Sequence, residues 1–304
     1  LGMLEGCPTP TVRADLPSLD VVTHKLWLDR EDWPHRQAVI EAELRRLSPD
    51  AVLLQEVLQD VGLPNQAQTL ARNLGYHAFF VSVDPVGRAR RYGNAILTRE
   101  AATLRGFRRL QPHDAYRIAG WVRTAVRGRE VNLYVVHLDF EDRTGATRAR
   151  QVADLLDFVD ATHGDAPVVI GGDFNITADA AEMAPLRDRF FDAFAAAHPG
   201  EALDDDAHTT LNPRFNPPAR IDRIHAQKGM FATPQARRIL DVPDAPGRWA
   251  SDHYGVWAGL PFAPPAEVDP AAAAAQPAFK TWRKTPIGTR ARIFLKYQQL
   301  IREN

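Results

Sequence analysis

Apolar residues along the chain recur with two spacings, one typical of strands and one typical of helices. Between residues 35 and 47, Val39, Ile40, Leu44 and Leu47 lie three and four positions apart, which is the spacing of one buried helix face. The predicted helices span 35–47, 67–74 and 146–162, and the predicted strands span 21–28, 51–54, 76–83, 94–98, 118–126, 131–138, 167–170, 220–225, 237–242 and 253–260.

The order of these elements indicates the fold class. Arg127-Gly128-Arg129 joins two predicted strands directly, which is typical of a tight hairpin and of antiparallel pairing. Other neighbouring strands are joined through helices, which favours parallel pairing. We therefore expect an α/β (α+β) fold, a four-layered sandwich of two packed mixed β-sheets flanked by helices.

Composition narrows the class of protein. The 304 residues are 45% hydrophobic and 25% charged, which excludes a disordered, collagen-like or coiled-coil chain. No apolar run approaches the roughly 20 residues of a membrane span, and the first residues lack a signal-peptide pattern, so we expect a cytoplasmic monomer. A single cysteine, Cys7, excludes an intramolecular disulfide and a zinc site built from cysteines.

Charge is unevenly distributed, although the net charge is only −1. Residues 84–130 contain eleven arginines and four acidic residues, whereas residues 154–206 contain thirteen acidic residues and two arginines. The near-neutral balance argues against binding nucleic acid through bulk electrostatics. The asymmetry has two explanations: a basic rim that faces phosphate beside an acidic, metal-holding rim, or an ordinary solvated surface.

Three segments are distinguished by composition. We expect one domain over residues 20–262, an Ala/Pro-rich linker over 263–279, and a basic amphipathic tail helix over 280–304 outside that domain. The segment 279–304 resembles the N-terminal helical segment of aldehyde dehydrogenases. The tail is therefore explained either as a fusion or reading-frame artefact, or as a helix that docks on an anionic membrane surface or on a partner.

Polar residues at the ends of predicted strands are the candidates for chemistry, because ligands commonly bind at the rim of a sheet. Carboxylates there can hold Mg²⁺, and a histidine beside a carboxylate can act as a base or contact phosphate. Each residue alone is also explained by a turn, a cap or a strand edge. The residues concerned are Glu56, His137, Asp173, Asn175, Asp222, Asp252 and His253.

The joint occurrence of these motifs in this order resembles the endonuclease/exonuclease/phosphatase superfamily of metal-dependent phosphoesterases. That family includes pancreatic deoxyribonuclease, apurinic/apyrimidinic endonucleases and sphingomyelinases, and its fold of two packed mixed sheets agrees with the fold expected above. The matching motifs are Leu54-Gln55-Glu56-Val57, Gly93-Asn94-Ala95-Ile96-Leu97, Val136-His137-Leu138, Gly172-Asp173-Phe174-Asn175, Arg220-Ile221-Asp222-Arg223-Ile224 and Ser251-Asp252-His253.

The resemblance implies a metal ion and an activated water. Glu56 would be the principal ligand of Mg²⁺, with Mn²⁺ as an alternative, and Asp252 would support the metal site. Asp173 would position or deprotonate the attacking water, and Asn175 would orient that water and the phosphate.

The resemblance also implies contacts to the phosphate. His137 would donate to a phosphate oxygen, and Asp222 would hold His253, the second phosphate contact and an alternative base. Asn94 and Arg117 are further candidates for phosphate binding.

One residue departs from the family pattern. Lys25 stands where the family has an asparagine that helps to hold the metal-side network. A lysine ammonium there would either repel Mg²⁺ or act as a fixed cation that touches the phosphate.

Together these features predict a Mg²⁺-dependent phosphoesterase that hydrolyses a phosphodiester by in-line attack of water. The substrate is a phosphate ester, with nucleic acid as the first candidate. A lipid phosphodiesterase of the sphingomyelinase type and a sugar-phosphate phosphatase are alternatives. Because of Lys25, a catalytically impaired protein that only binds phosphate is a further alternative.

Overall fold

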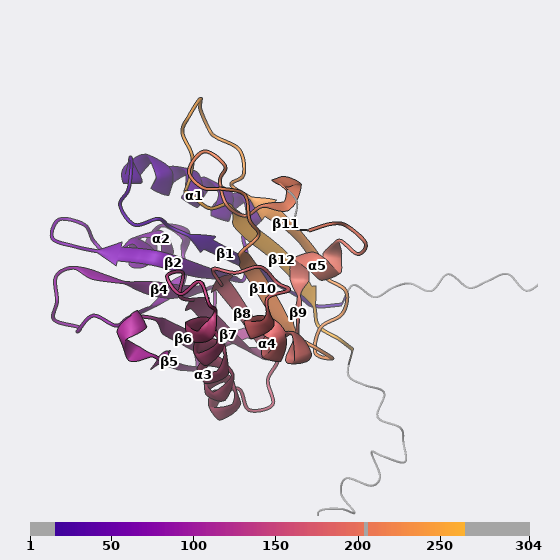
Figure 1. Ribbon diagram of the computed structural model, residues 1–304. Coiled ribbons are helices and arrows are strands. Elements are labelled where there is room, and N and C mark those ends of the chain that lie inside the picture. Colours follow the sequence, from indigo (N-terminus) through magenta and orange to yellow (C-terminus); the bar gives the residue numbers. More distant parts are fainter. Residues whose placement is uncertain (1–15, 204–205, 265–304) are drawn as a thin grey trace, which may run out of the picture. The chain divides into compact units, whose positions relative to one another are not determined.

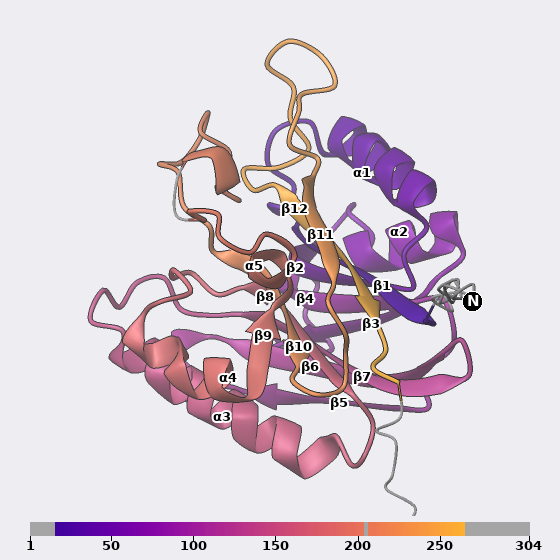
Figure 2. The same ribbon diagram turned by 90° about the vertical axis from the view of Figure 1, so that its right-hand side faces the viewer.

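Two six-stranded mixed sheets pack face to face in the computed structural model, which describes residues 16–203 and 206–264 (Figures 1 and 2). The first sheet has the order β11-β12-β1-β2-β4-β3 and the second the order β5-β6-β7-β8-β10-β9. Helices α1 and α2 cover the outer face of the first sheet, and α3 and α4 cover that of the second (Figure 2). The predicted four-layered α/β fold is therefore confirmed.

The first sheet contains β1 (Ser18–Lys25), β2 (Ala51–Gln59), β3 (His77–Ser82), β4 (Arg91–Thr98), β11 (Gln235–Ile239) and β12 (Gly255–Pro261). The second contains β5 (Leu104–Arg109), β6 (Ile118–Val126), β7 (Arg129–His137), β8 (Val168–Asp173), β9 (Phe190–Asp192) and β10 (Asp222–Gln227). The α-helices are α1 (Trp33–Leu47), α2 (Gln66–Leu74), α3 (Ala146–Thr162), α4 (Ala184–Arg189) and α5 (Ala193–Ala197).

The central strands are apolar on both faces because each lies between a sheet and a helix layer. Successive side chains of a strand point to opposite faces. In β2, Leu53 packs between the two sheets, whereas Leu54 packs under α1 and α2. In β7, Val135 packs between the sheets and Tyr134 under α3. This double burial explains the continuous apolar runs of the sequence.

The predicted hairpin is present between β6 and β7. Val126 pairs with Arg129, so Arg127 and Gly128 form a two-residue loop, and both have positive φ (52° and 80°). This is the geometry that favours glycine and that matches the twist of two antiparallel strands.

Some helices and strands differ from those predicted from the sequence. The strand expected over 21–28 runs from Ser18 to Lys25, because Trp27 and Leu28 have positive φ and leave the extended conformation. Strand β5 was not predicted, since its residues are mostly exposed and arginine-rich at the edge of the sheet. Helices α4 and α5 and strand β9 were missed because elements of three to six residues carry no periodicity.

Gly172 gives the first stability prediction. Its φ is 155°, and a Cβ atom there would lie 2.0 Å from the backbone oxygen of Val136 in the neighbouring strand. We expect Gly172→Ala to lower the free energy of unfolding by about 3 kcal/mol, the upper end of the usual cost of overpacking. Gly87→Ala is the matched control, because nothing lies within 4 Å of its Cβ position. Equal urea midpoints for the two variants would contradict this prediction.

Part of the sequence interpretation falls outside the described residues. The tail helix expected over 280–304 and the linker from residue 265 onward lie there, so the domain limits stay predictions. In the part of the chain that the structure describes, no helix is both long enough and apolar enough to cross a membrane.

Candidate active site

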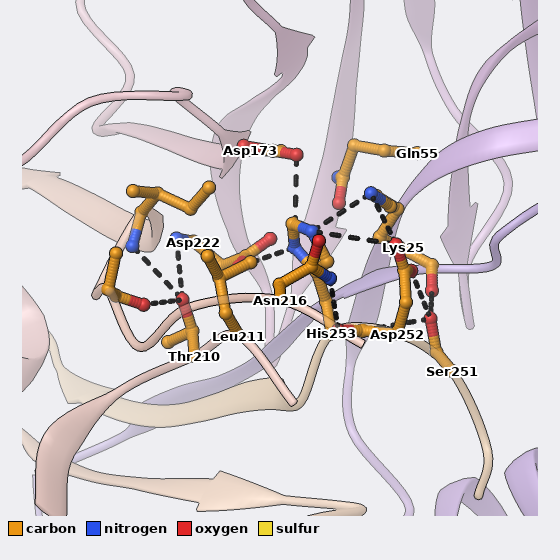
Figure 3. A network of polar contacts seen from close by, with 12 residues as sticks. Lys25, Gln55, Asp173, Thr210, Leu211, Asn216, Asp222, Ser251, Asp252 and His253 are labelled. Carbon is orange, nitrogen blue, oxygen red and sulfur yellow. Dashed lines mark hydrogen bonds and ion pairs between the residues drawn. The ribbon is translucent and has the colours of Figure 1, made fainter. Parts of the chain in front are cut away.

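The strand-end residues meet at one edge of the two sheets. In the second sheet, Asp173 at the end of β8 lies opposite His137 of β7 on one side and Asp222 of β10 on the other. In the first sheet, Lys25 at the end of β1 lies beside Gln55 of β2. Figure 3 shows how these strands and the loop before β12 bring their side chains together. The sequence therefore identified a set of residues that converge in space.

His253 is the centre of the network in Figure 3. Its Nδ1 lies 2.9 Å from Asp222 Oδ2, and its Nε2 lies 2.9 Å from Lys25 Nζ. Burial lowers the pKa of His253, but the Asp222 carboxylate outweighs this effect and raises it. A lysine ammonium can donate only to a ring nitrogen that carries no hydrogen. In this arrangement His253 is therefore neutral, with its Nδ1–H donating to Asp222 and its Nε2 accepting from Lys25.

Asp173 is a buried carboxylate with one oxygen left free. Its Oδ1 accepts a hydrogen bond from the Asn175 backbone N–H (3.0 Å). Within the described residues Oδ2 has no hydrogen-bond partner, and it lies 3.5 Å from His137 Nε2 and 3.8 Å from His253 Nδ1. Burial and the neighbouring Asp222 carboxylate raise the pKa of Asp173 to about 6. A basic oxygen that faces two imidazoles is suited to hold and deprotonate a water molecule.

His137 is oriented by a residue that the sequence interpretation missed. The Tyr92 hydroxyl lies 3.2 Å from His137 Nδ1, so the ring presents Nε2 to Asp173. Burial, together with Arg117, Lys25 and His253, lowers the pKa of His137 well below its usual value, which keeps the ring neutral. The only sequence signal for Tyr92 was its place directly before the Gly93-Asn94 motif.

Two candidate residues have strained backbones. Glu56 and Asn175 have φ of 52° and 53°, which is uncommon for residues other than glycine. The strain at Glu56 coincides with a bulge in β2 between Leu54 and Val57. Asn175 donates from Nδ2 to the Leu138 backbone oxygen (2.9 Å), which leaves its own side-chain oxygen available. Strain of this kind accumulates at functional sites, where the surrounding structure maintains it.

Asn94 and Arg117 line a small pocket beside His137. Asn94 is buried and donates from Nδ2 to the Ile118 backbone oxygen (2.9 Å), so its amide joins the two sheets. Arg117 is also buried, and its guanidinium lies 5.6 Å from the centre of the exposed Phe140 ring. The structure thus places a positive charge near His137, whereas one of the two N–H donors of the Asn94 amide is used by Ile118.

The residues that would form the metal site implied by the resemblance agree least well with the family pattern. Lys25 Nζ lies 3.1 Å from Asp252 Oδ2 and 3.6 Å from Glu56 Oε1, the two residues that would hold the ion. Burial would lower the pKa of Lys25, but the carboxylates around it, Glu56 first, outweigh burial and raise it, so the ammonium is charged. Mg²⁺ needs oxygen ligands at about 2.0–2.1 Å. An ammonium already in this gap and a divalent ion exclude each other, so these residues do not fit the ion as they stand.

A second group of potential ligands is formed by Asp173, Asp222 and His253, whose ligand atoms lie within 4.8 Å of one another. Asp222 Oδ2 and His253 Nδ1 in this group are already joined by a hydrogen bond. The group is therefore better described as a hydrogen-bonded acid–base cluster than as a metal centre.

Comparisons with known proteins identify relatives over two separate parts of the chain. The model of the endonuclease/exonuclease/phosphatase family matches residues 26–253, and that of the aldehyde dehydrogenase family matches residues 251–304. Malonate-semialdehyde dehydrogenase 2 of Geobacillus kaustophilus is 55% identical over 49 residues, 16% of this chain. The chain spans only 10% of the length of that dehydrogenase.

The larger part of the chain resembles phosphoesterases. Tyrosyl-DNA phosphodiesterase 2 of Mus musculus is 25% identical over 266 residues, which are 84% of this chain and 69% of that protein. The crystal structure of a humanized D. rerio TDP2 matches with a TM-score of 0.66 at 20% identity, over 80% of this chain and 99% of that one. The human nocturnin catalytic domain, solved with a bound sulfate anion, matches with a TM-score of 0.65 at 21% identity, over 82% of this chain and 97% of that one. The family match covers most of the chain, and the chain therefore belongs to the endonuclease/exonuclease/phosphatase family.

Proposed function

We propose that the chain is a phosphoric ester hydrolase that cleaves a phosphodiester by one-step, in-line attack of water. Family membership supports the reaction class. The observation that carries the proposal is the buried Asp173 Oδ2, free of hydrogen bonds among the described residues and flanked by His137 and His253. A phosphodiester is anionic, so its hydrolysis needs an aligned water and compensation of charge.

Each residue has a part in this reaction. The water oxygen forms a new bond to phosphorus while the bond to the leaving oxygen breaks, and the proton of the water passes to Asp173. The leaving oxygen takes up a proton from solvent. Asn175 orients the water through its side-chain oxygen. His137 Nε2 contacts an oxygen of the phosphate. Asp222 fixes the ring of His253 through Nδ1, and His253 Nε2 in turn holds the Lys25 ammonium.

The metal requirement depends on Lys25. Mg²⁺ or Mn²⁺, when bound, would neutralise charge on the phosphate, and Glu56 and Asp252 are its ligands under the family interpretation. They would be free to bind the ion only if the Lys25 ammonium left its place between them. No step of the mechanism above therefore passes through a metal ion.

Nucleic acid is the first candidate for the substrate. The mouse relative is named for a phosphodiester between tyrosine and DNA. Arg88 and Arg90 are exposed but pair with the carboxylates of Asp84 and Asp60. The half-buried Arg91 and the pocket residue Arg117 are therefore the arginines that support a basic rim. Lipid phosphodiesters and sugar phosphates remain as second candidates.

Hydrolysis of a generic aryl phosphodiester tests the proposed function. We expect turnover that Asp173→Asn lowers by about 10²–10⁴-fold. A parallel panel of plasmid DNA, RNA, tyrosyl-DNA, sphingomyelin and inositol phosphates then identifies the substrate. If no phosphodiester in either assay is hydrolysed, while inorganic phosphate binds, the chain is the phosphate-binding protein of the alternative interpretation.

The pH profile gives a further prediction. Asp173 must be ionised to accept a proton, and burial with the Asp222 carboxylate raises its pKa to about 6. We therefore expect kcat/KM to be full above this pKa and to fall about tenfold per pH unit below it. Circular dichroism at each pH controls for unfolding. A profile that stays flat between pH 8 and pH 5 would remove Asp173 from the role of base.

A further inference from the structure

Lys25 carries a positive charge at the centre of the candidate site. Its side chain is only 10% exposed, and its Nζ contacts three groups at once: His253 Nε2 at 2.9 Å, Asp252 Oδ2 at 3.1 Å and Glu56 Oε1 at 3.6 Å. These distances are those of hydrogen bonds and ion pairs. A buried ammonium persists only with such compensation, so the surrounding acceptors fix its position.

The backbone of Lys25 is fixed as well. The Ser251 hydroxyl donates to the Lys25 backbone oxygen (2.7 Å), and it also lies 3.2 Å from Asp252 Oδ1. On the other side, the Leu26 N–H donates to the Gln55 backbone oxygen (2.8 Å). The two carboxylate partners of the lysine, Glu56 on β2 and Asp252 before β12, are thus held in register with it. The ammonium is positioned by the fold and not by a mobile surface side chain.

We propose that the Lys25 ammonium permanently takes the place of a divalent ion between Glu56 and Asp252. It supplies the fixed positive charge that contacts a non-bridging oxygen of the bound phosphate. The proposal rests on the proposed function for its catalytic consequence, but the occupation of the site by Lys25 does not. A lysine ammonium has three donors. His253 Nε2 at 2.9 Å and Asp252 Oδ2 at 3.1 Å take two of them, and Glu56 Oε1 at 3.6 Å is only an ion-pair partner, so the third donor is available to a phosphate oxygen.

This placement of Lys25 has two consequences that distinguish the site from a metal-dependent one. First, a divalent ion would have to displace a buried, charge-compensated ammonium, so the chain binds such an ion poorly. Second, an ammonium cannot ionise a bound water as a metal ion does, so activation of the nucleophile depends on Asp173 alone. The reaction then proceeds in the presence of a chelator.

Binding of Mn²⁺ without substrate tests the placement. The free Mn²⁺ signal in electron paramagnetic resonance is titrated with wild type, Glu56→Gln, Lys25→Asn, Lys25→Asn/Glu56→Gln, and Lys228→Asn as the matched exposed lysine. We expect wild type and Lys228→Asn to bind Mn²⁺ weakly. Lys25→Asn should bind it about 10- to 100-fold more tightly, and the double variant should lose this gain. Tight binding by wild type that Glu56→Gln removes, or no gain in Lys25→Asn, would overturn the proposal.

Hydrolysis of the aryl phosphodiester in EDTA tests the catalytic consequence. In EDTA, wild type should retain its turnover, and Lys25→Met should turn over about 10²–10³-fold more slowly. Lys25→Asn should be inactive in EDTA and active when Mn²⁺ is supplied in place of the chelator. Loss of wild-type turnover in EDTA would overturn the proposal. If the Mn²⁺ titrations give the expected order and no variant hydrolyses any diester, the proposed function fails and the placement of Lys25 stands.

Discussion

Asp173→Asn should reduce phosphodiester turnover by about 10²–10⁴-fold, the usual contribution of a positioned general base. The amide has the shape of the carboxylate, but it cannot accept the proton of the attacking water. Because burial and Asp222 make the Asp173 charge costly in the folded state, its removal should leave the thermal midpoint unchanged or raise it. Loss of activity without loss of stability is the signature of a catalytic group.

Steady-state hydrolysis and thermal unfolding are measured on the same preparations. Asp157→Asn is the matched control, since Asp157 is exposed on α3, away from the site. We expect it to keep both turnover and midpoint. An Asp173→Asn protein that retains turnover within about tenfold of wild type would assign the base to another residue.

Asp192→Ala should lower the free energy of unfolding by about 3–5 kcal/mol, the cost of removing one partner from a buried ion pair. Asp192 Oδ2 lies 2.6 Å from Arg220 Nη1 and 3.5 Å from Arg223 Nε, and its side chain is 9% exposed. Its Oδ1 also accepts from the Phe194 N–H at the start of α5 (3.0 Å). The variant would therefore leave buried arginine charge undercompensated and uncap a helix.

Asp160→Ala provides the control for this effect. Asp160 pairs with Arg189 on the surface, where its side chain is 55% exposed, so its loss should cost no more than about 1 kcal/mol. Urea denaturation compares the two variants. Similar losses of unfolding free energy in the two variants would show that the buried cluster around Asp192 contributes no more to stability than a surface ion pair.

The sequence was sufficient to predict the layers of the fold and the residues that come together at one edge of the two sheets; their roles stay predictions. Continuous apolar runs such as that of β7 predict strands buried on both faces, and the hairpin at Arg127-Gly128 predicts antiparallel pairing; both are present. Motifs at strand ends predicted which side chains converge, because the carboxyl ends of the parallel pairs β1/β2 and β7/β8 lie at the same edge as the amino end of the antiparallel strand β10. The exposed edge strand β5 could not be found this way, since its arginines give no apolar pattern.

Partnerships between side chains could not be read from the sequence. Nothing in its local pattern shows that Tyr92 orients His137, because the two lie 45 positions apart and meet only through packing of the two sheets. The departure at Lys25 was visible, but its two consequences, repulsion of a metal or direct contact with phosphate, could not be separated. The 2.9 Å contact with His253 favours an ammonium that is built into the site.

The stereochemical course of hydrolysis tests the central claim most directly. A phosphodiester with a chiral phosphorothioate centre is hydrolysed in ¹⁸O-labelled water, and the configuration at phosphorus is determined in the product. One-step attack by the water held at Asp173 predicts inversion, with the reaction lost in Asp173→Asn. Retention of configuration would require a covalent intermediate on the enzyme and would contradict the account.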